Sequence, residues 1–266
     1  MHRLLIAPTS LQESAPIEYI EATARAGYDG IGLRVHRSPG LPFHPVLGDA
    51  ALIREMKLRI ADSKLEVFDL YSFYLEPETD VATFAPAMEL GASFGAKYAT
   101  VMGADTDWSR QRDNFARTCD LAAQFSLTCS VEFAVIRPLA TLPQTVQLIT
   151  EAKREAAICI DPLHLARSGG SPADVKALDP KYFPYAQMSD GVLAPGEPNP
   201  ALFGKLGFGT RHLPGEGTLP LRELLAALPA DIPLSVELPI SLAAPGTSAH
   251  DWARITLEST RRCLAQ

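Results

Sequence analysis

Long hydrophobic runs are missing from this sequence of 266 residues. No uninterrupted run of apolar residues exceeds five, whereas a helix that crosses a bilayer needs about 18 or more. The apolar residues that follow Met1 stop at Pro8, which is too early for a secretory signal. We therefore expect no membrane-spanning segment and a cytoplasmic protein.

Cysteine and positive charge are also scarce. The four cysteines, Cys119, Cys129, Cys159 and Cys263, show no C-x-x-C spacing, which predicts reduced thiols rather than a disulfide framework. The 24 Lys and Arg residues face 31 Asp and Glu residues, for a formal net charge of −7. Since nucleic-acid binding depends on basic side chains that neutralise phosphates, we expect no nucleic-acid partner.

Two common nucleotide-binding motifs are absent as well. The first apolar segment leads into Ala7-Pro8-Thr9-Ser10 rather than a G-x-G-x-x-G turn, and no G-x-x-x-x-G-K-[ST] sequence occurs. These absences argue against a dinucleotide-binding fold and against a P-loop fold. With 47% hydrophobic and 21% charged residues, the chain can still bury a large core.

The sequence does contain a regular alternation of short apolar segments, typical of strands, with amphipathic segments typical of helices. The predicted strands cover 3–7, 29–34, 65–71, 98–103, 127–134, 157–161, 183–189 and 233–238. The predicted helices lie near 15–26, 49–63, 80–95, 108–125, 143–155, 172–178, 218–228 and 248–264. Eight such pairs in a chain of this length predict an α/β fold, a (β/α)8 TIM barrel that forms one domain over 1–266.

One predicted connection, at about 190–217, is long and rich in Gly and Pro. It leaves the C-terminal end of the predicted strand 183–189, and the active sites of TIM barrels lie at that end of the strands. Long loops without secondary structure are usually functional or disordered. We therefore expect an active-site loop that covers the mouth of the barrel.

Four side chains with oxygen donors lie at or near the ends of four successive predicted strands, namely Glu132, Asp161, Gln187 and Glu237. Taken singly, each acid could cap a helix or face solvent. Together they interrupt apolar segments, and neighbouring barrel strands would bring them to one point. Three buried carboxylates repel one another unless a cation lies among them. The set therefore predicts a divalent metal site, with Mn²⁺ or Mg²⁺ favoured by the oxygen donors and Co²⁺ or Zn²⁺ as further possibilities.

Further polar residues near the predicted strand ends are candidates for binding a substrate. His164 lies three residues after Asp161 and is a candidate proton carrier, although a supporting role is the commoner one for such a histidine. Arg211 and His212 open the sequence Arg211-His212-Leu213-Pro214-Gly215-Glu216-Gly217, and an arginine there suits a carboxylate or a phosphate. A salt bridge that anchors the loop is an equally good explanation of Arg211.

A second group of candidates lies beyond the predicted strands 29–34 and 65–71. Arg34 and His36 would hold the far end of a ligand, with a solvent-facing role as the alternative. Tyr71 could line the pocket, although aromatic residues in barrels more often pack between the sheet and the helices.

These strand ends resemble the xylose-isomerase-like TIM-barrel superfamily, which includes sugar and sugar-phosphate isomerases and epimerases, inosose and 3-dehydroshikimate dehydratases, and the endonuclease IV type of repair enzyme. The similarity follows nearly the whole chain in order and spacing, with a D-x-x-H motif and a P-G-x-G turn. The matching segments are Val131-Glu132-Phe133, Ile160-Asp161-Pro162-Leu163-His164, Gln187-Met188-Ser189-Asp190, Arg211-His212-Leu213-Pro214-Gly215-Glu216-Gly217 and Val236-Glu237.

The resemblance implies that Glu132, Asp161, Gln187 and Glu237 are the metal ligands, and that His164 and Arg211 contact the substrate. Many epimerases of this group carry His where this chain has Gln187, whereas some dehydratases carry Gln. The small number of histidines and the acidic composition argue against the endonuclease IV branch.

The function that we expect is a divalent-metal-dependent isomerase or epimerase. Its substrate would be a small sugar or polyhydroxylated keto compound that passes through a metal-stabilised enediolate. Glu132, Glu237 and His164 would be catalytic, with the two glutamates on opposite sides of the substrate. A dehydratase of the inosose or 3-dehydroshikimate type is the first alternative, and a non-catalytic sugar-binding barrel is the second. The resemblance also makes a homo-oligomer possible.

Overall fold

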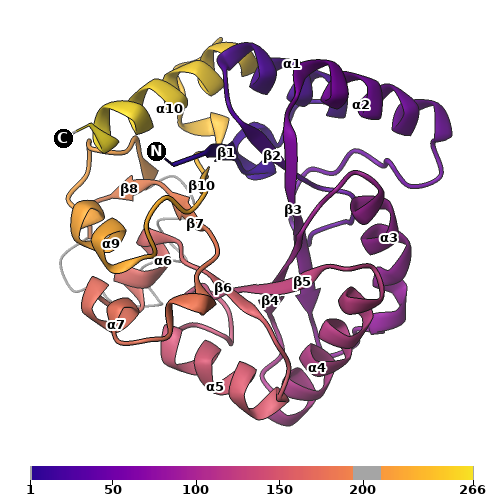
Figure 1. Cartoon of the computed structure of the whole chain (residues 1–266), viewed down its shortest axis with the longest axis vertical. Helices are drawn as coiled ribbons and strands as arrows, with labels where there is room; N and C mark the ends of the chain where they lie inside the picture. The colour runs from indigo at the N-terminus through magenta and orange to yellow at the C-terminus, as the bar shows by residue number, and fades with distance from the viewer. Residues whose placement is uncertain (1, 194–210, 266) are drawn as a thin grey trace.

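The computed structural model describes residues 2–193 and 211–265. Its eight parallel strands form a ring that helices surround (Figure 1). The strands follow one another in the order β6-β5-β4-β3-β2-β1-β10-β7, and a bridge from Ile160 to Ala186 joins the two ends of the sheet. The TIM-barrel prediction is therefore confirmed. The strands are β1 (Leu4–Ile6), β2 (Gly30–Leu33), β3 (Glu66–Leu75), β4 (Tyr98–Gly103), β5 (Thr128–Glu132), β6 (Ala157–Cys159), β7 (Ala186–Met188) and β10 (Leu234–Val236).

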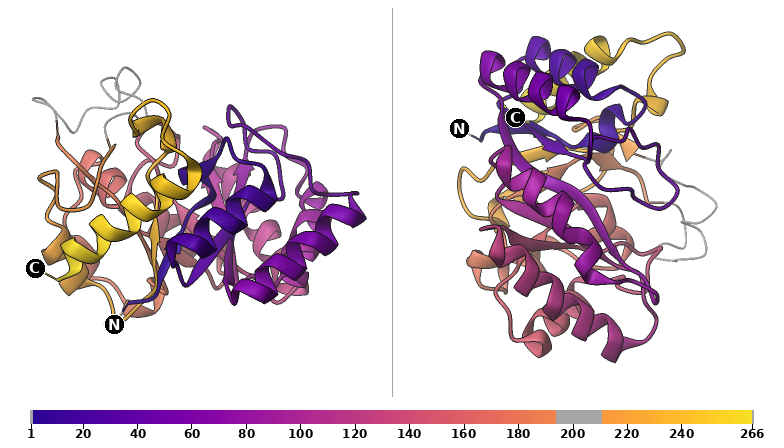
Figure 2. Two further views of the ribbon diagram at one scale, coloured as in Figure 1. Left: turned by 90° about the horizontal axis from the view of Figure 1, so that it is seen from above. Right: turned by 90° about the vertical axis from the view of Figure 1, so that its right-hand side faces the viewer.

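Several helices of the ring begin at side-chain caps, namely those that follow Asp49, Asp107 and Ser248. In the fifth helix, Thr141 and Gln144 form a reciprocal capping box, and Pro143 occupies the first turn, where its missing N–H costs nothing. The last helix lies beside the first, so the two ends of the chain complete the ring (Figures 1 and 2). The helices are α1 (Pro16–Ala26), α2 (Ala50–Ser63), α3 (Ala85–Ser93), α4 (Trp108–Gln124), α5 (Leu142–Ala152), α6 (Pro162–Arg167), α7 (Pro172–Lys176), α9 (Leu221–Ala227) and α10 (Ala249–Leu264).

Short helical segments account for most differences from the prediction. The helix expected near 80–95 begins as the 3-10 helix η2 (Val81–Phe84) before α3. The 3-10 helix η1 (Pro8–Leu11) and helix α6 were not expected, because four and six residues are too few to show a helical period. Both follow barrel strands directly, so both lie at the C-terminal mouth of the barrel, where the predicted site residues are.

The expected long loop is described only at its two ends. Strand β8 (Asp190–Gly191) pairs antiparallel with β9 (Arg211–His212), and this ribbon brings Arg211 back to the mouth of the barrel. The positions 194–210 lie outside the described residues, so the active-site cover stays a prediction. No helix within 2–193 or 211–265 is both long and apolar enough to cross a membrane.

The interior of the barrel is packed rather than hollow. Leu5, Phe68, Cys159 and Tyr185 form a buried apolar cluster inside the ring. Such a filled interior leaves the C-terminal mouth as the place where side chains from several strands can meet a ligand.

Candidate active site

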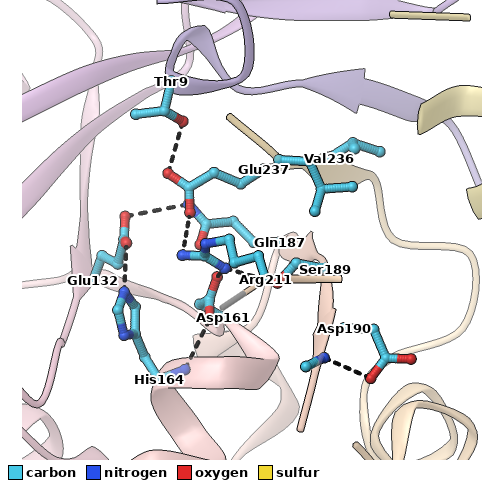
Figure 3. Close-up of polar contacts among 12 residues, drawn as sticks. Thr9, Glu132, Asp161, His164, Gln187, Ser189, Asp190, Arg211, Val236 and Glu237 are labelled. Carbon is cyan, nitrogen blue, oxygen red and sulfur yellow. Dashed lines mark hydrogen bonds and ion pairs between the residues drawn. The ribbon is translucent and has the colours of Figure 1, made fainter. Parts of the chain in front are cut away.

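The short helix α6 places Asp161 and His164 side by side at the barrel mouth. Asp161 follows β6 and caps α6, because its Oδ1 accepts the backbone N–H of His164 at 2.8 Å. Nε2 of His164 lies 3.8 Å from Oε1 of Glu132, the last residue of β5 (Figure 3). All three side chains are buried. The D-x-x-H spacing therefore places the Asp161 carboxyl group and the His164 imidazole side by side at the start of a helix of six residues.

The 3-10 helix η1 holds Glu237 in position. The hydroxyl of Thr9 donates to Oε1 of Glu237 at 2.8 Å (Figure 3). Ser10 donates to the carbonyl of Val236 at 2.9 Å and accepts the N–H of Leu238 at 3.0 Å, which fixes the backbone on both sides of the acid. Because β1 pairs with β10, η1 lies directly beside this position. The two ends of the chain therefore build this part of the site together.

The hydroxyl of Tyr71 lies among three of the four predicted metal ligands. It is 2.6 Å from Oε2 of Glu132 and 2.8 Å from Oε1 of Glu237, and Nε2 of Gln187 donates to it at 3.1 Å. A hydroxyl has one hydrogen, so the second carboxyl contact needs a protonated carboxyl group. Burial, together with the charge of Glu237, raises the pKa of Glu132 well above its usual range. Glu132 is therefore the glutamate whose protonated form burial favours.

Arg211 lies between the other two acids. Its Nη1 donates to Oδ2 of Asp161 at 2.6 Å and to Oγ of Ser189 at 2.7 Å, and its Nη2 donates to Oε2 of Glu237 at 2.8 Å (Figure 3). Burial disfavours the charge on Arg211, but Asp161 and Glu237 outweigh this effect and raise its pKa. Burial likewise opposes ionisation of Asp161, yet the charge of Arg211 prevails and lowers the pKa of that carboxyl. Arg211 thus forms two buried ion pairs, and its contact with a substrate stays a prediction.

The P-G-x-G turn positions Arg211 through Asp190. The Asp190 carboxylate accepts the backbone N–H groups of Gly215 at 3.0 Å, Gly217 at 3.0 Å and Leu219 at 3.1 Å. A Cβ on Gly217 would come within 2.3 Å of Oδ1 of Asp190, so the turn can wrap the carboxylate only with glycine there. The motif therefore has a structural task, which is to hold β9 against β8.

Burial sets the charge state of His164. It lowers the pKa of the imidazole to about 4, although the charge of Asp161 acts in the opposite direction. His164 is therefore neutral near pH 7 and offers one N–H donor and one nitrogen acceptor rather than a positive charge.

The donor set suits a hard divalent cation in its chemistry. Oε1 of Gln187 is buried and has no hydrogen-bond partner in the described part of the chain, so one amide oxygen next to the acids is unused there. The three buried carboxyl groups of Glu132, Asp161 and Glu237 share one guanidinium, and a further positive charge would reduce their repulsion. Across the described ranges, no group of three or more His, Cys, Asp or Glu side chains is arranged to hold a metal ion. Tyr71 and Arg211 instead join the acids to one another.

The structure brings six of the predicted site residues into one buried cluster: Glu132, Asp161, His164, Gln187, Arg211 and Glu237. Arg34 lies beside this cluster, because its charge interacts with Glu237 and with Tyr71. The structure does not bring the two remaining predicted residues into it. His36 packs on Phe73, with ring centroids 5.4 Å apart. His212 is exposed, and strand alternation directs it away from the side of Arg211.

The sequence did not assign a polar role to Tyr71 or to Thr9. A signal for both existed, because Tyr71 ends the predicted strand 65–71 and Thr9 follows the predicted strand 3–7. The rule that selected the acids at strand ends would also have selected these two hydroxyl groups.

The comparisons with known proteins concern the family and the fold of the chain. The family model described as xylose isomerase-like TIM barrel matches residues 20–263. No curated protein matches the chain in sequence. A solved xylose isomerase-like TIM barrel/4-hydroxyphenylpyruvate dioxygenase fusion protein is 19% identical, with a TM-score of 0.77. That match covers 97% of this chain and 42% of the fusion protein, so this chain spans less than half of the fusion protein's length.

Three further solved structures match over nearly their whole length. The IolI protein with a bound zinc atom is 18% identical, with a TM-score of 0.80 and coverage of 99% of this chain and 98% of that one. AsbF from Bacillus anthracis, described as a probable 3-DHS dehydratase, is 15% identical, with a TM-score of 0.74 and coverage of 98% and 99%. The 3-keto-D-glucoside 4-epimerase YcjR from E. coli is 15% identical, with a TM-score of 0.73 and coverage of 99% and 100%. At these identities the likeness shows the fold alone.

Proposed function

Since the chain belongs to the xylose isomerase-like TIM barrel family, we propose that it is a divalent-metal-dependent isomerase or epimerase acting on a small sugar or polyhydroxylated keto compound. The observation that carries this proposal is the buried cluster of Glu132, Asp161, Glu237 and Gln187 at the C-terminal mouth of the barrel. Buried acids this close together are costly, and perturbed acids in such a position are typical of catalytic sites.

Glu132, Asp161, Gln187 and Glu237 are the residues that would hold the cation. All four offer oxygen donors, which favours Mn²⁺ or Mg²⁺, with Co²⁺ and Zn²⁺ as further candidates. When bound, the cation would supply stabilisation of negative charge on the carbonyl and neighbouring hydroxyl oxygens of the substrate.

The two glutamates are the proton carriers of the proposed reaction. Glu237 is the base that removes a proton from the carbon next to the carbonyl, which leaves an enediolate. Glu132, whose pKa burial raises, is the acid that returns a proton to the neighbouring carbon or to the opposite face. Neutral His164 donates a hydrogen bond to a substrate oxygen. Arg211 and Arg34 complete the proposed substrate contacts, whereas His36 packs on Phe73 and His212 is exposed and turned away from Arg211.

A dehydratase is the second candidate, because Gln187 stands where many epimerases of this group carry His. AsbF, with the same fold, is described as a dehydratase. In this reaction the same proton removal is followed by loss of a β-hydroxyl group as water. The leaving hydroxyl group would take up the proton that Glu237 has removed, and His164, which burial keeps uncharged near pH 7, would donate a hydrogen bond to it.

Exchange of substrate protons with deuterated water tests both candidates. The enzyme is incubated with Mn²⁺ and a panel of neutral and acidic keto sugars, and ¹H NMR follows the signal of the proton next to the carbonyl. We expect exchange with the wild type and its loss with Glu237→Gln. Glu216→Gln is the matched control, because Glu216 is an exposed glutamate on the neighbouring turn.

The products separate the candidates. An unchanged mass supports an isomerase or epimerase, and a mass lower by one water supports a dehydratase. Binding without exchange for every compound would replace both with the non-catalytic sugar-binding barrel. Full exchange in Glu237→Gln would remove Glu237 from the mechanism.

A further inference from the structure

Arg34 has buried hydrogen-bond donors that the protein does not use. It directly follows β2 at the C-terminal end of the barrel, and its Nη1 donates to the carbonyl of Pro42 at 3.2 Å. Its Nε and Nη2 are buried and have no hydrogen-bond partner among the described residues. Leaving donors of a charged group buried and unpaired costs more free energy than leaving neutral ones. A ligand that accepts hydrogen bonds from Arg34 would remove that cost.

No acid among residues 2–193 and 211–265 is placed to pair with Arg34. Glu237 attracts its charge, but Oε1 of Glu237 already accepts from Thr9 and Tyr71, and Oε2 accepts from Arg211. No ion pair of Arg34 occurs in the part of the chain that the structure describes. The position therefore differs from that of Arg211, which forms ion pairs with both Asp161 and Glu237.

A second arginine with an unused donor lies close by. The guanidinium of Arg137, beyond β5, is 4.8 Å from the ring centroid of Tyr74, and its Nε is buried with no partner among the residues that the structure describes. Tyr74 also interacts with the charge of Arg34. Two cations without a carboxylate partner among the described residues thus lie around one buried tyrosine near the end of β3.

There is room for ligand atoms next to Arg34. A cavity of about 50 Å³ borders its side chain, with Tyr19, Pro42 and His44 in the wall. A single water needs only about 10–15 Å³ on the same measure. The cavity is therefore large enough for a small polar group.

We infer that Arg34, assisted by Arg137, binds an oxyanion of the substrate, either a carboxylate or a phosphate monoester. The inference rests on the proposed function and narrows its substrate class to acidic sugars or acidic keto polyols. The guanidinium fork offers parallel N–H groups to two oxygens of such an anion. The hydroxyl of Tyr71 bonds to both glutamates, and the register of β2 and β3, in which Leu33 pairs with Leu70, places Tyr71 next to Arg34. The reacting carbon would lie near the glutamates while the acidic end lies at Arg34.

Three non-reacting polyols with the same carbon chain test this inference. Isothermal titration calorimetry measures the binding of D-sorbitol, D-gluconate and D-sorbitol 6-phosphate to the wild type. We expect one or both anions to bind at least about tenfold more tightly than D-sorbitol, as charge-assisted hydrogen bonds allow. Arg34→Gln should remove this preference and Arg34→Lys should restore part of it. Arg37→Gln is the matched control, because Arg37 is exposed and its guanidinium lies over Phe43.

The results of this binding test can be distinguished from those of the proton-exchange test of the proposed function. A preference for D-gluconate identifies a carboxylate and a preference for D-sorbitol 6-phosphate identifies a phosphate. Equal binding of all three polyols by the wild type would overturn the inference, as would a preference that persists in Arg34→Gln. Arg137→Gln, with an expected loss of about three- to tenfold, serves as a second variant if Arg34→Gln does not fold. Since these polyols do not react, the anion preference can fail while proton exchange occurs, and it can hold in a barrel without turnover.

Discussion

In the half of the barrel formed by β5, β6, β7 and β10, buried acids share an ion-pair partner, whereas in the other half Arg34 after β2 and Asp69 on β3 have no ion-pair partner among the described residues. Arg211 bridges Asp161 and Glu237 on the paired side. On the other side, Arg34 has two unused donors, and the buried acid Asp69 has hydrogen bonds but no cation partner among the described residues.

The two halves therefore differ in how their stability depends on a bound ligand. A buried ion pair is weak evidence for stability as a whole, but the removal of one partner is strongly destabilising, because the other charge is left unpaired. The paired half is therefore sensitive to mutation of its own residues. The unpaired half already bears the cost of unpaired groups, so a mutation there relieves that cost and a ligand offsets it.

The largest expected difference between the two halves is in how mutation of Arg211 and of Arg34 changes the stability of the protein. Arg211→Met leaves Asp161 and Glu237 without their shared cation, so we expect the free energy of unfolding to fall by about 3–5 kcal/mol. Arg34→Met removes a cation that has no ion-pair partner, and we expect no loss or a small gain. Urea unfolding at pH 7 measures both. Similar losses in the two variants would show that the halves do not differ in the way described.

The buried acids Asp69 and Asp161 also distinguish the two halves, because their pKa values are shifted in opposite directions. Burial raises the pKa of Asp69 from 3.8 to about 6, although hydrogen bonds from Thr100 and Tyr185 lower it. The folded state therefore binds this proton more tightly than the unfolded state, and stability falls as pH rises from about 4 through about 6. Above that range the ionised carboxyl costs about 3 kcal/mol, at about 1.4 kcal/mol for each unit of pKa.

Asp69→Asn removes this titration. We expect the wild type to lose about 3 kcal/mol relative to the variant between about pH 4 and pH 7, measured by urea unfolding at each pH. Asp161, paired with Arg211, has its pKa shifted in the opposite direction and provides the internal contrast. Parallel pH profiles for the wild type and Asp69→Asn would contradict the assignment.

Much of the paired half could be predicted from the sequence, because its residues obey a positional rule. Glu132, Asp161, Gln187 and Glu237 each interrupt an apolar segment at the end of a strand, and strand ends converge in a barrel. The eight strands themselves are short apolar segments between helices of strong amphipathic period, and all eight were expected where the structure has them.

The contacts within the site could not be predicted, because they depend on atoms far apart in the sequence. Tyr71 meets Glu237 across the ring, and nothing in the local pattern of either strand marks that contact. The unpaired state of Arg34 is a property of its surroundings, since the sequence shows the cation but not the missing acid. Helix α6 was too short to give a periodic signal, although it positions His164.

A smaller loss of stability is expected on removal of the Tyr71 hydroxyl, which lies between the two halves. Tyr71→Phe removes the contacts to both glutamates without changing the ring, so we expect a loss of about 1–2 kcal/mol in the metal-free protein. A cation held by the same acids would replace those contacts, so Mn²⁺ should raise the melting temperature of the variant more than that of the wild type. Equal shifts in the two proteins would argue against a cation site at Glu132 and Glu237.

The smallest effect is expected at His212, which tests whether the site ends at the buried cluster. Its side chain is exposed and turned away from Arg211, whereas Arg211 and its partners are buried. Exposed substitutions usually change free energies by no more than about 0.5 kcal/mol, so His212→Ala should alter the affinity for D-gluconate by about two- to threefold at most. The same titration calorimetry measures it, with Arg34→Gln as the large-effect reference. A loss at His212 as large as that at Arg34 would extend the site beyond both halves to the outer face of β9.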